Sequence, residues 1–206
     1  MAYRPANPHD ALQRLIEGNA RFLAGNPRLD IYCNEKFSEL AQAQRPYATI
    51  LGCSDSRVPP EIIFDADVGD LFVIRVAGNV VSPEVLGSIQ YAALHLETPL
   101  FMVLGHQRCG AVAAALDAIH HGHRQASRIQ ALLDGMIPGL EAIEPGLDLD
   151  TELQRGVEAN VRWSMRRLLE TPEAKMRAAE GKMQLVGAVY EIATGRVRLL
   201  PDGSGH

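Results

Sequence analysis

Three short apolar runs constrain the fold of this chain more than any other feature. They span residues 48–52, 71–77 and 100–105, each is rich in Val, Ile, Leu or Phe, and none alternates with polar residues. Such runs are typical of strands that are buried on both faces, as in parallel sheets. Helical patterns separate or follow them, and strands that alternate with helices predict an α/β fold with a mostly parallel sheet.

The expected helices are recognised by apolar residues at helical spacing and by capping residues at their ends. Asp10 can cap a first helix, with Gln13 three residues on as a capping box. Residues 82–83 (Ser-Pro) are suited to the N-cap and the first turn of a second helix. A third helix is expected from about 110 to 120, and a fourth ends before Pro172.

A last strand is expected over 184–192, and it turns at 193–195 into an edge strand over 197–200. The Gly and Pro residues of 124–150 predict short helices and loops. The chain has no repeat, low-complexity tract or obvious linker, so we predict one domain over 1–206. It would consist of a helical arm (1–45) and an α/β core (46–206), and the arm could pack on its own domain or on a neighbouring subunit.

Composition limits the possible partners. The 206 residues carry a net charge of −5, which argues against nucleic acid or an anionic membrane as the main partner. No apolar run approaches the ~20 residues needed to span a bilayer. The N-terminus lacks a signal-peptide core, so we expect the cytoplasm. Three cysteines are too few for a disulfide scaffold, and a reducing compartment leaves thiolates available for a metal.

Metal-ligating residues follow two of the predicted strands. The segment Cys53-Ser54-Asp55-Ser56-Arg57 comes directly after the first strand, and His106 and Cys109 follow the third. Because ligands bind at the carboxyl ends of strands in open α/β sheets, Cys53, His106 and Cys109 can meet at one point. Two thiolates and an imidazole suit tetrahedral zinc. The fourth position is then left for water or Asp55, which is typical of a catalytic site.

Three segments carry a family resemblance. CSDSRVPPE (53–61), DLFVIRVAGN (70–79) and GHQRCGAV (105–112) resemble the β-class carbonic anhydrases. The resemblance runs from the N-terminal helix (LIEGNARF) to the last strand (LVGAVYEIATG), so it covers nearly the whole chain. It implies a four-stranded parallel core sheet with an extra edge strand. It also implies a zinc enzyme, with one Zn²⁺ per chain, that interconverts CO2 and bicarbonate as a homodimer or a multiple of dimers.

The expected chemistry follows from the residue types. Zinc can bring the pKa of bound water to about 7, and zinc-bound hydroxide would attack the carbon of CO2. Thiolate ligands weaken this effect, so activity should rise above neutral pH. Asp55 can accept the hydroxide proton, and Arg57 can hold Asp55 by a bidentate pair. The resemblance implies a closed form in which this aspartate binds zinc. A plain loop-stabilising ion pair is the alternative for Asp55 and Arg57.

Four further residues match family positions that contact substrate. The resemblance implies that the Gln44 amide donates to a substrate oxygen, and the backbone N–H of Gly110 is a possible second donor. Phe72 and Tyr91 match positions that line a narrow apolar pocket, part of which the partner subunit supplies. An apolar pocket suits CO2. The alternatives are a solvated loop amide for Gln44 and core packing for Phe72 and Tyr91.

Arg75 and Tyr190 match two residues of a regulatory bicarbonate site found in some family members. The Trp position of that site is Ile50 here, and the only tryptophan, Trp163, lies far away in a helix. We therefore do not expect this regulation. Gln44 instead resembles the constitutively open subtype.

Two groups of residues are left over. His120, His121 and His123 could bind a metal or shuttle protons, but a solvated helix end, where a charged histidine suits the helix dipole, is the favoured interpretation. Cys33 is interpreted as a packing residue.

Carbonic anhydrase is the first functional hypothesis, and three others compete with it. A zinc hydrolase of CS2 or COS could use the same fold. A non-catalytic zinc-stabilised sensor or assembly module would need the open metal position to be lost, or Asp55 to be permanently on the metal. A thiol redox protein lacks support because the chain has no C-x-x-C pair.

Overall fold

The structure is a computed structural model that describes residues 7–28, 37–38, 40–146 and 148–201. Five strands form one sheet in the order β2-β1-β3-β4-β5. The first four strands are parallel to one another, and β5 is antiparallel to β4 at the edge. The predicted α/β fold, with a four-stranded parallel core and an edge strand, is therefore confirmed. The strands are β1 (Ala48–Gly52), β2 (Leu71–Arg75), β3 (Leu100–His106), β4 (Gln184–Glu191) and β5 (Arg196–Leu199).

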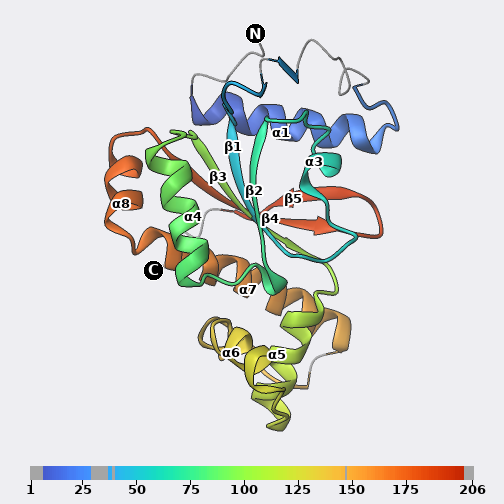
Figure 1. Ribbon diagram of the computed structural model, residues 1–206. Coiled ribbons are helices and arrows are strands. Elements are labelled where there is room, and N and C mark those ends of the chain that lie inside the picture. The colour runs from blue at the N-terminus through green and yellow to red at the C-terminus, as the bar shows by residue number, and fades with distance from the viewer. Residues whose placement is uncertain (1–6, 29–36, 39, 147, 202–206) are drawn as a thin grey trace.

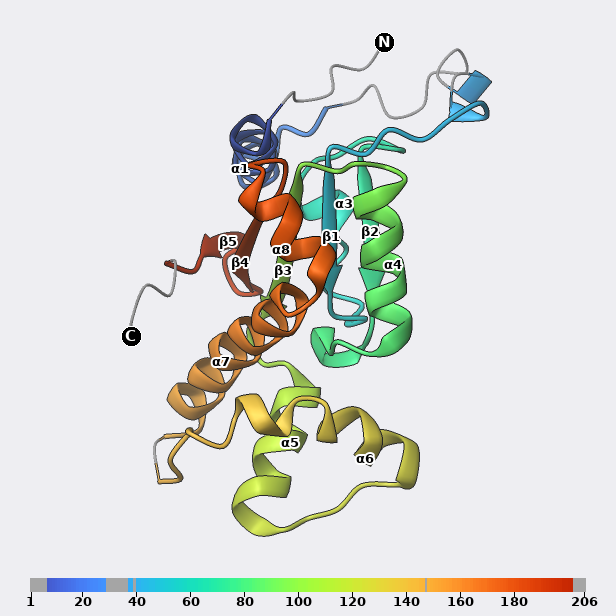
Figure 2. The same cartoon turned by 90° about the vertical axis from the view of Figure 1, so that its left-hand side faces the viewer.

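Helices cover both faces of the sheet (Figures 1 and 2). Neighbouring strand residues point to opposite faces, so Ile50 packs in the core beneath α1 and α3, whereas Leu51 packs in the core formed with α4, α5 and α7. The helices α5 and α6 extend beyond the carboxyl end of the sheet (Figure 2). The α-helices are α1 (Pro8–Leu23), α3 (Pro60–Ile63), α4 (Pro83–Leu94), α5 (Gly110–His121), α6 (Ser127–Asp134), α7 (Leu149–Leu169) and α8 (Pro172–Ala179), and the 3-10 turns are η2 (Ala77–Asn79) and η3 (Ile137–Gly139).

The first helix begins earlier than its sequence pattern predicts. Asn7, not Asp10, is the N-cap, because the Asn7 side chain accepts a hydrogen bond of 2.9 Å from the backbone N–H of Asp10. Pro8 occupies the first helical position, where its missing N–H is not needed. The prediction that Asp10 and Gln13 form a capping box was therefore wrong.

The helix α1 packs on its own sheet. Asn19, buried on α1, donates to the carbonyls of Ile63 at 3.1 Å and Gly195 at 3.0 Å, and accepts from the N–H of Val197 at 2.9 Å. Leu15 of the same helix is fully buried in the core between α1 and the sheet. The part of the predicted arm that forms α1 therefore packs on the chain's own domain.

Other predicted elements have shifted boundaries. The second strand ends at Arg75 and not at 77, because the chain turns into η2, where Gly78 has a φ of 64°. That left-handed conformation favours glycine, and a Cβ there would lie 2.5 Å from the Met136 sulfur. The described residues of 124–148 include the short helix α6 and the turn η3, as expected, and the long helix α7 begins at Leu149. Cys33 lies outside the described residues. Within the described ranges, no helix has the length and apolarity needed to cross a membrane.

Candidate metal centre

Two adjacent parallel strands bring Cys53, His106 and Cys109 together. Cys53 directly follows β1, His106 is the last residue of β3, and Cys109 is the N-cap of α5. Arg108 has a φ of 53°, which turns the chain sharply between the strand and the helix. The ligand atoms of Cys53, His106 and Cys109 all lie within 4.8 Å of one another, and all three residues are buried. Residues that are far apart in the sequence thus form one compact cluster at the carboxyl edge of the sheet.

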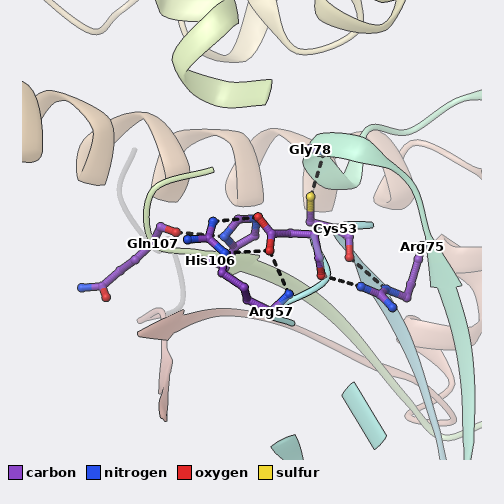
Figure 3. Close-up of polar contacts among 7 residues, drawn as sticks. Cys53, Arg57, Arg75, Gly78, His106 and Gln107 are labelled. Carbon is purple, nitrogen blue, oxygen red and sulfur yellow. Dashed lines mark hydrogen bonds and ion pairs between the residues drawn. The ribbon is translucent and has the colours of Figure 1, made fainter. Parts of the chain in front are cut away.

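The orientation of His106 suits a metal. Its Nδ1 lies 2.9 Å from the carbonyl oxygen of Gln107 and donates to it, so in the neutral ring the lone pair is on Nε2 (Figure 3). This Nε2 is buried and has no hydrogen-bond partner in the described part of the chain. A buried nitrogen without a partner is costly unless another group occupies that position. The donor set of two sulfurs and one imidazole fits Zn²⁺, for which such a nitrogen is a natural ligand.

The electrostatic environment favours a thiolate at Cys53. The hydrogen bond from Cys109 lowers the pKa of the Cys53 thiol, and contacts from His106 and the N–H groups of Asp55 and Gly78 add to this effect, against the opposing effect of burial. The N–H of Gly78 lies 3.3 Å from the Cys53 sulfur (Figure 3). The same interaction with Cys53, together with burial, raises the pKa of Cys109. A cation at the cluster would favour the thiolate form of both cysteines.

Two buried residues of α7 support the η2 turn, and sequence reasoning missed them. Asn160 donates from its side-chain nitrogen to the carbonyl of Gly78 at 2.8 Å, and Ser164 donates to the carbonyl of Asn79 at 3.1 Å. They hold the backbone that presents the Gly78 N–H to Cys53. The signal was present, because Asn160 and Ser164 are four residues apart on the otherwise apolar face of a helix.

The Asp55–Arg57 pair lies beside the cluster. Arg57 Nε is 2.9 Å from Asp55 Oδ1, and Arg57 Nη2 is 2.8 Å from Oδ2, so the pair is bidentate. The Arg57 guanidinium holds the pKa of the Asp55 carboxyl well below its usual range. Asp55 Oδ2 lies 3.9 Å from His106 Nε2. Asp55 is therefore a carboxylate next to the cluster whose two oxygens are both bound to Arg57.

Arg75 holds the loop that carries Cys53 and Asp55. Its Nε donates to the carbonyl of Cys53 at 3.0 Å and its Nη2 donates to the carbonyl of Asp55 at 2.6 Å (Figure 3). From the sequence, Arg75 was expected only to match a residue of the regulatory bicarbonate site. Tyr190 lies on β4 opposite His106, largely buried, and burial raises the pKa of its phenol. Ile50, which stands where that site would have Trp, is fully buried in the core.

The predicted substrate-contacting residues fall into two groups. Gly110 follows Cys109 and begins α5, where backbone N–H groups have no partner within the helix. The other three lie towards the amino end of the sheet. Gln44 precedes β1 and is exposed, and Phe72, near the start of β2, stacks on Tyr91 of α4 with ring centroids 6.1 Å apart. A strand of five residues spans ~16 Å, so within one chain these three are far from Cys53.

Comparisons with known proteins agree with this geometry. A family model described as carbonic anhydrase matches residues 48–197. The chain is 40% identical over 195 residues to a carbonic anhydrase of Mycolicibacterium smegmatis, which covers 94% of each chain. It is 42% identical over 195 residues to carbonic anhydrase 2 of Mycobacterium tuberculosis, covering 94% of this chain and 93% of the relative.

Solved structures give the same result for the fold. The β-carbonic anhydrase CcaA superimposes with a TM-score of 0.77 at 28% identity, covering 92% of this chain and 95% of the other. One of two tetrameric β-carbonic anhydrases from Sordaria macrospora gives a TM-score of 0.74 at 27% identity, covering 96% and 98%. With its parallel sheet and its Cys-His-Cys cluster, this chain belongs to the β-class carbonic anhydrase family and is an enzyme of that class.

Proposed function

We propose that this chain catalyses the reversible hydration of CO2 to bicarbonate and a proton, with one Zn²⁺ per chain held by Cys53, His106 and Cys109. The observation that carries the proposal is the convergence of three buried side chains of ligand type, with His106 Nε2, which has no hydrogen-bond partner among the described residues, beside them. When bound, zinc supplies a Lewis acid that lowers the pKa of water to about 7. Because two ligands are thiolates, we expect activity to rise above neutral pH.

Asp55 is the residue that would orient the attacking oxygen. Its carboxylate is ionised and lies beside the metal ligands, so Oδ2 can accept a hydrogen bond from a water molecule and leave an oxygen lone pair aimed at CO2. Arg57 binds both carboxylate oxygens, which keeps Asp55 from becoming a fourth metal ligand. This arrangement supports an open site, in which the last metal position is free for solvent.

Gly110 would contact the oxygens of the substrate. Its N–H is at the N-terminus of α5, directly after the ligand Cys109. Helix N-termini favour negative charge, so this end of α5 suits bicarbonate and the charge that develops on CO2 during attack.

Residues of a second copy would complete the pocket. Gln44, Phe72 and Tyr91 are too far from the cluster of their own chain, and Tyr91 is 46% exposed beside Phe72. We propose that these residues contribute to the site of a partner subunit in a homodimer or a multiple of dimers. One of the similar solved structures is described as tetrameric, which supports association. The thiolate ligands suit a reducing compartment, and we therefore expect the cytoplasm.

Replacing Asp55 tests the proposed function. The D55A variant should lose CO2 hydration by about 10²- to 10⁴-fold, the range for a positioned acid–base group, while zinc stays near one per chain. Stopped-flow CO2 hydration and metal analysis measure the two effects, and D10A, a change near the start of α1, is the control. An unchanged rate in D55A would contradict the assigned role. Turnover of COS or CS2 with negligible CO2 hydration in zinc-loaded protein would overturn the proposed reaction.

A further inference from the structure

A second cluster of ligating side chains lies at the far end of α5. Asp117, His121 and His123 each offer a ligand atom, and these atoms lie within 4.8 Å of one another. Asp117 Oδ1 is 3.1 Å from His121 Nδ1, and Asp117 Oδ2 is 2.8 Å from His123 Nδ1. The two imidazole rings have centroids 5.9 Å apart and are tilted by 30°. Both histidines therefore present Nδ1 to one carboxylate.

The local backbone explains why the cluster forms. Asp117 and His121 are four residues apart and so share a face of α5. Gly122 ends the helix with a φ of 71°, a left-handed conformation that favours glycine. This turn brings His123 back beside Asp117. The Asp117 carboxylate, which accepts hydrogen bonds from both rings, is ionised at neutral pH like an ordinary aspartate and can bind a cation.

His120 is not part of the cluster and instead fixes the helix beneath it. Its side chain is only 6% exposed, and Nδ1 lies 3.0 Å from Glu152 Oε1 of α7. Its Nε2 lies 2.9 Å from the carbonyl oxygen of Ile143. The expectation of a solvated helix end was therefore wrong for His120, because its ring is packed between α5 and α7. His121 and His123, at 65% and 68% exposed, do face solvent.

We propose that Asp117, His121 and His123 form a second metal site, which takes a divalent transition cation such as Zn²⁺, Ni²⁺ or Cu²⁺. Two imidazoles and one carboxylate suit these ions, whereas Mg²⁺ and Ca²⁺ require mainly oxygen ligands. Three protein ligands on an exposed surface leave the remaining positions open to water. The site is at the other end of a 12-residue helix from Cys109, about 18 Å away, and it does not depend on the proposed function.

Binding of the ion replaces the hydrogen bonds within the cluster. Each imidazole offers the lone pair of one ring nitrogen to the cation, so a hydrogen now on Nδ1 moves through solvent to Nε2 or is released. Asp117 stays ionised and contributes an oxygen. Because the ion joins both sides of the Gly122 turn, it stabilises the last turn of α5.

The test uses untagged protein already loaded with one Zn²⁺ per chain, titrated with further Zn²⁺ by calorimetry. We expect one additional equivalent to bind. H121Q and H123Q should each weaken this second binding by about tenfold or more, since loss of a direct ligand exceeds the effect of an outer partner. H9Q, which changes an exposed histidine on α1, is the matched control and should bind as the wild type does.

Nitrogen NMR of the histidine rings identifies the ligands independently. The ring signals of His121 and His123 should shift on addition of the second equivalent, and those of buried His120 should shift less. Excess Mg²⁺ should not reproduce the shifts. Absence of a second equivalent in the wild type, or equal binding in the wild type, H121Q and H123Q, would overturn the proposal.

Discussion

Asn160 offers a direct test of how the fold supports the metal ligands. Asn160→Ala removes the hydrogen bond of 2.8 Å to the Gly78 carbonyl, and the N–H of that same Gly78 donates to the Cys53 sulfur. Both Asn160 and Gly78 are buried, so water cannot replace the lost donor. The change should therefore affect both the stability of the fold and the binding of zinc.

The magnitude follows from the hydrogen bonds involved. Leaving one buried carbonyl without a donor should lower the free energy of unfolding by about 1–3 kcal/mol. The Asn160 side-chain oxygen has no hydrogen-bond partner within the described ranges, so its removal adds no further loss. Loss of a ligand's outer partner typically costs about 10- to 100-fold in metal affinity, and Asn160 acts through such a partner, Gly78, so zinc affinity should fall measurably but by no more than this.

Urea unfolding of the zinc-free protein measures the first effect, and competition with a chelator measures the second. Leu168→Ala is the control, because Leu168 is buried on the same helix about two turns further on. It should destabilise the fold by about 2–5 kcal/mol and leave zinc affinity unchanged. If Asn160→Ala loses stability but binds zinc as tightly as the wild type, the η2 turn does not tune the metal site and the reasoning fails.

Three other predictions concern pH, the η2 turn and α1. Arg57 lowers the folded pKa of Asp55 below its unfolded value of about 3.9, so the pair stabilises the fold above that pH and the contribution is lost as pH falls. The difference in unfolding free energy between wild type and R57Q should therefore shrink below about pH 4, and a constant difference would contradict this. Gly78→Ala should lower the free energy of unfolding by about 1–3 kcal/mol, because φ is 64° at Gly78 and alanine is strained in that conformation. An unchanged midpoint of urea unfolding would show that alanine is tolerated there. Asn19→Ala leaves three backbone groups without their partner and should cost about 2 kcal/mol or more. Hydrogen exchange should show faster exchange in α1, and unchanged rates would argue against this tether.

The fold class could be predicted because its signal is local and repeated. Strands buried on both faces must be apolar throughout, and β1 and β3 are apolar enough to be recognised without neighbours. Boundaries were harder to predict. The start of α1 depends on one side-chain hydrogen bond from Asn7, and the end of β2 depends on a left-handed turn at Gly78. Either feature shifts an element end by a few residues without changing the apolar pattern.

The candidate ligands could be named from their motifs and their positions after the strands. The burial and the hydrogen-bond partners of individual side chains could not be predicted in this way. His120 shows the difference, since it has the same local sequence context as His121 but is buried against α7, whereas His121 is exposed. Asn160 and Ser164 gave only a weak signal, because two polar residues on an apolar helix face do not indicate which backbone groups they bind.

The sequence alone was sufficient for the α/β class, for the family resemblance and for naming the candidate ligands, because these depend on residue identity and short-range spacing. Only the tertiary structure decided that α1 packs on its own sheet, that Arg75 and Asn160 hold the loops around Cys53, and that Gln44 lies far from the cluster of its own chain. The physical reason is that these contacts join residues far apart in the sequence. Which of them form is set by how helices and strands pack together, and side-chain type does not encode that directly.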